Sequence, residues 1–124
     1  MSIRVLLVDD EPDMRMLLRL MLERTEDIEV VGEASSGLDA IEQMTGLVPD
    51  VLLLDQMMPG GPTGIETAER VFATSGDAAP RMVLFTAWAS PELAEQAASA
   101  GIHRFLSKDD FSLVAETIRE VAAR

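Results

Sequence analysis

The sequence predicts a doubly wound α/β domain with a five-stranded parallel sheet and five helices. Short runs of consecutive apolar residues recur along the chain, as in strands that are buried on both faces. Each run is followed by a segment with helical apolar spacing, and such alternation is typical of a parallel sheet covered by helices. The chain has 124 residues, enough for one core, so we expect residues 1–124 to form a single domain.

The first half of the chain contains two strand–helix units. Residues 3–8 form an apolar run of strand length that includes one arginine. Pro12 and the apolar spacing after it predict a helix over residues 12–24. Residues 28–34 alternate only in part, which favours a less buried strand, and residues 37–44 have the spacing of a short helix. The side chains of that short helix expected to face the core are Leu38, Ile41 and Met44.

The middle of the chain repeats this pattern twice. Residues 51–54 are all apolar and predict a fully buried strand. Residues 65–72 have helical spacing after a loop rich in Gly and Pro, and residues 82–85 predict another buried strand. Ser90–Pro91 suits the N-cap and first turn of a helix, and Gly101 suits its end.

The last unit is a short strand at residues 105–106 and a helix over residues 110–123. The side chains of this helix expected to face the core are Phe111, Val114, Ile118 and Val121. The three most apolar strands are the first, third and fourth of the chain. Those strands are central in the flavodoxin-like order 2-1-3-4-5, so we expect that order.

Composition narrows the classes of function. The chain has 22 acidic and 10 basic residues and a net charge of −12, which disfavours direct binding of nucleic acid. Cysteine is absent, which excludes disulfides and thiolate metal sites. No apolar stretch approaches the roughly 20 residues that span a bilayer, and the N-terminus lacks a signal-peptide layout. We therefore expect no membrane association, and a cytoplasmic location fits.

Polar residues follow four of the five predicted strands. Asp9 and Asp10 end the first strand, Asp55 ends the third, Thr86 follows the fourth and Lys108 follows the fifth. Ligands of doubly wound sheets bind at the carboxyl ends of the strands, near the switch between the first and third strands. These side chains are therefore expected to converge on one site.

The expected cluster suits a metal ion and a phosphoryl group. Carboxylates that share a site raise one another's pKa, and Mg²⁺ relieves this repulsion because it prefers oxygen ligands. Asp55 can act as a nucleophile that forms an acyl phosphate. Lys108 can neutralise one phosphoryl oxygen, and the Thr86 hydroxyl can bind another.

Each of these residues also has an ordinary structural interpretation. Asp9, Asp10 and Glu11 can cap the following helix, and Asp55 can be a turn residue. Thr86 can be a strand-end threonine and Lys108 a solvated surface lysine. The combination at one end of the sheet favours the functional interpretation.

These motifs resemble the receiver domains of bacterial response regulators, the two-component partners of sensor histidine kinases. The resemblance runs from residue 3 to about residue 123. It implies that Asp55, followed by Met58–Pro59, accepts a phosphoryl group from the kinase. It also implies that Thr86 and Phe105 act as the switch pair and that Lys108 is the lysine of the site.

The resemblance implies a ligand set for Mg²⁺, for which Mn²⁺ can substitute. Asp10 and Asp55 would bind the ion directly, Asp9 would act through water, and Met57 would supply its backbone carbonyl. The chain would be a regulator that catalyses its own phosphorylation and dephosphorylation, and not a turnover enzyme. Phosphorylation would change the surface formed by the fourth helix, fifth strand and fifth helix.

Two segments resemble the NarL/FixJ-type branch, namely residues 27–34 and residues 107–110. Regulators of that branch carry a C-terminal helix-turn-helix domain, so the resemblance implies such an output domain outside this chain and a role in transcription regulation. It is also compatible with a homodimer that forms on phosphorylation.

The chain departs from the family pattern beside Asp55. The loop Gly60–Gly64 is one residue longer than usual and lacks an Asp, and Gln56 replaces an aliphatic residue. Met57 and Trp88 are bulky, and we expect them to screen Asp55 and slow dephosphorylation, unless Trp88 points outward.

Three other functions compete with the switch. The altered loop leaves open a receiver that acts as a phosphorylation-independent protein-interaction module. A flavin-phosphate binder is disfavoured by the acidic segment 9–13, and a haloacid-dehalogenase-type phosphatase by Met57, where a second Asp would be needed.

Overall fold

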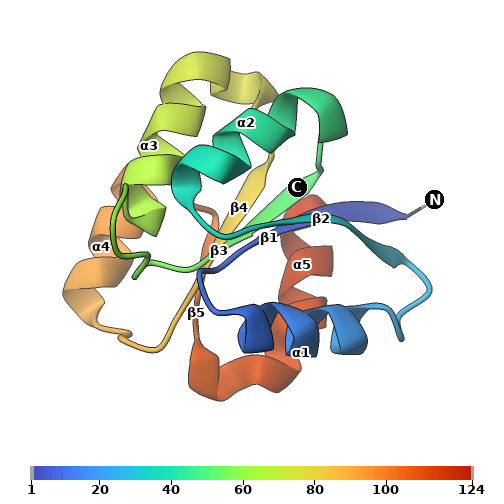
Figure 1. Cartoon of the computed structure of the whole chain (residues 1–124). Helices are drawn as coiled ribbons and strands as arrows, with labels where there is room; N and C mark the ends of the chain where they lie inside the picture. Colours follow the sequence, from blue (N-terminus) through green and yellow to red (C-terminus); the bar gives the residue numbers. More distant parts are fainter. Residues whose placement is uncertain (1, 124) are drawn as a thin grey trace.

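The computed structural model describes residues 2–123 and contains a five-stranded sheet in the order β2-β1-β3-β4-β5, with every neighbouring pair parallel (Figure 1). The order confirms the prediction. The central strands β1, β3 and β4 are the most apolar because both of their faces are covered by helices. The strands are β1 (Ile3–Val8), β2 (Ile28–Ala34), β3 (Val51–Leu54), β4 (Arg81–Thr86) and β5 (Arg104–Ser107).

Helices cover both faces of the sheet, as expected for a doubly wound fold (Figure 1). α2, α3 and α4 contribute to one apolar cluster, which contains Leu6, Leu52 and Leu84. α1 and α5 contribute to the other, which contains Val5 and Leu53. The helices are α1 (Pro12–Leu22), α2 (Gly37–Leu47), α3 (Gly64–Ser75), α4 (Pro91–Ser99) and α5 (Val114–Ala122), with short 3-10 helices η1 (Gly76–Ala78) and η2 (Lys108–Leu113).

The last helix differs from its prediction. Residues 108–113 form the 3-10 helix η2, and α5 begins only at Val114. Asp110 has a non-helical backbone (φ −100°, ψ 37°), which separates η2 from α5. The predicted inward side chains are nevertheless correct, because Phe111 packs against the cluster that contains the buried Val114.

Two further predictions were wrong. Leu38 is 55% exposed, because α2 turns the face of Gly37 and Ala40 to the sheet. The first helix ends at Leu22 instead of residue 24. At this end the Thr25 hydroxyl donates to the Leu22 carbonyl at 2.5 Å.

The strand register brings the ends of the central strands to one edge. Val8 pairs with Leu54, and Leu54 pairs with Leu84. The residues that follow these positions therefore emerge side by side at the carboxyl edge of the sheet. Within residues 2–123, none of the helices has the length and apolar character needed to cross a membrane.

Candidate functional site

The carboxyl ends of β1, β3 and β5 bring two carboxylates and one ammonium into contact. Lys108 Nζ lies 3.0 Å from Asp9 Oδ2 and 3.4 Å from Asp55 Oδ2. A third carboxylate oxygen, Glu11 Oε1, lies 3.6 Å from the same nitrogen. The side chains of Asp9 and Asp55 are only 4% and 5% exposed. The structure thus brings together residues that are as far apart in sequence as Asp9 and Lys108.

Backbone contacts hold Asp9 in place. Its N–H donates to the Ala34 carbonyl of β2 at 3.1 Å, and its own carbonyl accepts from the Arg15 guanidinium at 2.6 Å. Its Oδ1 accepts the Glu11 N–H at 2.9 Å, just before α1. Asp9 therefore does take part in the turn that leads into α1, while its other oxygen binds Lys108.

Negative charge exceeds positive charge at this site. Burial and the neighbouring Asp9 carboxylate raise the pKa of Asp55 to about 6, although Lys108 and the Met57 N–H favour the ionised form. Burial acts to lower the pKa of Lys108, but the hydrogen bond to Asp9 and the charges of the nearby carboxylates raise it overall. Lys108 is thus cationic at neutral pH and does not fully compensate the carboxylates around it.

The donor atoms fit a hard divalent cation. Asp9, Asp10, Glu11 and Asp55 each offer a carboxylate oxygen, and these four atoms lie within 4.8 Å of one another. Oxygen donors in this number suit Mg²⁺, which commonly takes one or two carboxylates and keeps several waters. A cation here would also relieve the surplus of negative charge.

A hollow of about 220 Å³ opens over these groups, and its lining includes Asp55, Lys108, Met57 and Trp88. The Trp88 side chain is 72% exposed and that of Met57 is 53% exposed. Both side chains therefore border the hollow without closing it. Their effect on water at Asp55 stays a prediction.

The two residues expected to form the switch lie outside the lining of this hollow. Thr86 is fully buried at the end of β4, and its hydroxyl accepts the Trp88 N–H at 3.3 Å. Phe105 is partly buried and packs against the apolar cluster under α2, α3 and α4. Both residues nonetheless lie on the strands that flank the site.

The family can be assigned from the whole sequence. The model of the response regulator receiver domain matches residues 5–119. The chain belongs to this family. The match confirms the resemblance that the motifs at Asp9, Asp55 and Lys108 had suggested, and it makes the chain a receiver domain of a two-component system.

Relatives of this receiver domain have different functions. Protein-glutamate methylesterase/protein-glutamine glutaminase 5 of Myxococcus xanthus is 46% identical over 107 residues, which cover 86% of this chain and 30% of that protein. The transcriptional regulatory protein LiaR of Bacillus subtilis is 36% identical over 118 residues, 94% of this chain and 54% of that protein. The chain thus spans only about a third to a half of these two relatives.

Solved structures agree with the family. The signal receiver domain of the putative response regulator NarL from Mycobacterium tuberculosis superposes with a TM-score of 0.90 at 32% identity, over 98% of this chain and 97% of that one. The response regulator domain of Thermotoga maritima CheB gives a TM-score of 0.90 at 28% identity, over 100% and 98% of the two chains.

Sequence reasoning missed two residues of the receiver domain's site. Glu11, which the sequence suggests only as part of a helix cap, makes no side-chain cap and instead faces Lys108. Arg15 holds the Asp9 carbonyl, and its Nε also donates to Glu33 at 3.0 Å. The sequence held no signal for Arg15, because its contact with the Asp9 carbonyl depends on the path of α1 over the sheet.

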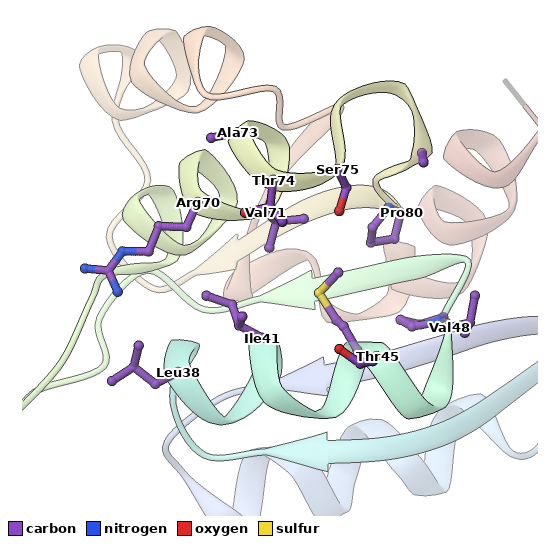
Figure 2. Close-up of a pocket in the computed structure, with 13 residues that line it drawn as sticks. Leu38, Ile41, Thr45, Val48, Arg70, Val71, Ala73, Thr74, Ser75 and Pro80 are labelled. Carbon is purple, nitrogen blue, oxygen red and sulfur yellow. The ribbon is translucent and has the colours of Figure 1, made fainter.

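A second hollow lies away from the acidic site. It has a volume of about 600 Å³, lies between α2 and α3, and is lined mainly by apolar side chains such as Ile41, Val48 and Val71 (Figure 2). Its lining contains no carboxylate, so it does not belong to the acidic cluster.

Proposed function

We propose that this receiver domain is a phosphorylation-controlled switch whose phosphoacceptor is Asp55. The donor would be the phosphohistidine of a sensor histidine kinase, and the reaction would depend on Mg²⁺. The observation that carries this proposal is the contact of Lys108 Nζ with both Asp9 and Asp55, under a hollow open to solvent. A solvated surface lysine would not be held by two buried carboxylates.

The proposed chemistry assigns one task to each group. An Asp55 carboxylate oxygen attacks phosphorus, and the bond from phosphorus to the donor nitrogen breaks. Lys108, at 3.4 Å from Asp55, neutralises negative charge on the transferred group. Asp10 and Asp55 would hold Mg²⁺, with Asp9 acting through water and Met57 through its carbonyl. The ion would offset charge on the phosphoryl oxygens.

The proposed switch links this site to a partner surface. In the present structure the Thr86 hydroxyl binds the Trp88 N–H. Rotation of that hydroxyl toward a phosphoryl oxygen would release this bond, and Phe105 would move inward beneath it. The surface of α4, β5 and α5 would then favour a partner or a second copy of the chain.

We propose transcription control as the output. LiaR and DesR of Bacillus subtilis are both named transcriptional regulatory proteins and cover most of this chain at 36% and 32% identity. A C-terminal helix-turn-helix domain outside this chain would contact DNA. The methylesterase relative represents a different output, which would be the alternative to transcription control.

Trp88 provides the test, because it is the single tryptophan and borders the hollow. Mg²⁺ is expected to change its fluorescence, and beryllofluoride or a small phosphodonor is expected to change it again. Asp55→Asn should lose the second response. Mass spectrometry should find one phosphoryl group on the unaltered chain and none on the variant. Mg²⁺ binding without phosphorylation would instead favour the phosphorylation-independent interaction module.

A further inference from the structure

Gln56 fastens the first turn of α3 to the end of β3. Its backbone carbonyl accepts the Gly64 N–H at 3.1 Å, and its side-chain Oε1 accepts the Ile65 N–H at 2.9 Å. The first amides of a helix have no partner within the helix, so one residue satisfies two of them here. The next amide, that of Glu66, is bound by the hydroxyl of the N-cap residue Thr63.

The same helix end also presses on the backbone of the acceptor residue. A Cβ atom at Gly64 would lie 2.3 Å from the Asp55 carbonyl oxygen and 2.8 Å from the Leu84 side chain. Only glycine allows this approach, because the contact with Asp55 is with backbone that cannot rotate away. Gln56 and Gly64 therefore hold α3 against the segment that carries Asp55.

The extra loop residue lies outside this fastening. Residues 57–63 run from Gln56 to the N-terminus of α3, which Gln56 binds, so both ends of the loop are held at the same place. Gly60 and Gly61 at its tip are exposed, and a Cβ built at either would meet no atom within 4 Å. Met58, next to the ligand candidate Met57, is only 4% exposed and is held in the core.

We propose that Gln56 is a positioning residue that sets the place of the Asp55 carboxylate and the Met57 carbonyl independently of loop length. This inference rests on the proposed function, since it concerns the same cation site. Gln56 supplies by its side chain the acceptor that an aliphatic residue at this position lacks. The longer loop without an Asp is then harmless, because its tip does not determine where the ligands lie.

The test compares Mg²⁺ affinity, measured by Trp88 fluorescence, in Gln56→Leu and Thr63→Ala. Both changes remove one side-chain acceptor from the N-terminus of α3, but only the first removes a hydrogen bond between the helix and the residue that follows Asp55. Gln56→Leu is expected to weaken Mg²⁺ binding by about 10-fold or more, as other losses of supporting contacts around metal ligands do. Thr63→Ala should leave the affinity close to that of the unaltered chain.

Two more variants sharpen the comparison. Gln56→Glu keeps an acceptor oxygen, so it should retain both the Mg²⁺ affinity and the slow hydrogen exchange of the Ile65 amide. Gln56→Leu should lose both properties. Deletion of Gly61 should change neither property. Equal loss of affinity in Gln56→Leu and Thr63→Ala would overturn the inference, because general fraying of α3 would then explain it.

The outcomes separate this inference from the proposed function. The positioning role alone would be overturned if Gln56→Leu left Mg²⁺ affinity unchanged. It would also be overturned if deletion of Gly61 weakened Mg²⁺ binding as strongly as Gln56→Leu does. An unaltered chain that binds no Mg²⁺ would overturn the proposed function together with this inference.

Discussion

Asp55→Asn is expected to stabilise the metal-free receiver domain at neutral pH. Burial and the Asp9 charge raise the pKa of Asp55 from 3.8 to about 6, so ionisation of this group opposes folding. Each pKa unit corresponds to about 1.4 kcal/mol, and the gap therefore sets a ceiling of about 3 kcal/mol on the gain. Asparagine keeps the shape of the side chain without the charge.

The sign of the pH dependence follows from the two protonation states. Below about pH 4 the carboxyl is protonated in both the folded and the unfolded chain, so it imposes no penalty. As the pH rises toward 6, the unfolded chain ionises first, and the free energy of unfolding falls. The full penalty is present above pH 6. Asp55→Asn should lack this fall.

Urea unfolding followed by circular dichroism, with a chelator and over a series of pH values, measures the effect. The advantage of Asp55→Asn should grow between about pH 4 and pH 6 and then level off. Asp77→Asn, which removes an exposed carboxylate from the 3-10 helix η1, is the control for charge removal. Mg²⁺ should stabilise the unaltered chain more than Asp55→Asn, because it binds the folded carboxylates. A variant less stable at pH 7.5, or a gain independent of pH, would refute the reasoning.

Three other predictions concern the site and the fold. Lys108→Met should slow phosphorylation by a small phosphodonor about 100-fold or more, because no other cation lies within 4 Å of Asp55 in the described residues. Intact-mass spectrometry would measure the phosphorylation rate, and an unchanged rate would show that Lys108 takes no part in the mechanism. Combined replacement of Met57 and Trp88 by serine should shorten the lifetime of the phosphoryl group, measured by loss of radiolabel, and an unchanged lifetime would show that they do not screen it. Val48→Asn should raise the free energy of unfolding by about 1 kcal/mol in urea titrations. Val48 has a φ of 46°, which asparagine adopts more readily than valine, and its side chain is 71% exposed. A loss of stability would mean that the valine side chain itself stabilises the fold.

The sequence could predict the order of elements because the burial of an element determines which of its consecutive positions are apolar. Residues 51–54 are apolar at every position, and each of them is buried, as a central strand covered on both faces requires. The switch from helical spacing to continuous apolar runs marks most boundaries. The apolar pattern gave a wrong prediction of burial for Leu38, since helical spacing alone does not decide which of two neighbouring apolar residues faces the sheet.

The sequence could also predict which residues gather, but not how they interact. The strand order fixed the edge at which Asp9, Asp55 and Lys108 would emerge. It gave no sign that Arg15 would hold the Asp9 carbonyl. That contact depends on the path of α1 over the sheet, which residue spacing does not encode.

The sequence by itself determined the strand and helix pattern, the strand order and the acidic class of the site, because each follows from local apolar spacing and from where charged residues end a strand. Only the tertiary structure decided that one ammonium serves three carboxylates, that Asp55 is buried enough to raise its pKa to about 6, and that Gln56 reaches the Ile65 amide. The physical reason is that burial, Coulomb interaction and hydrogen bonding depend on distances of a few ångströms between groups. Those distances are set by how the helices pack on the sheet.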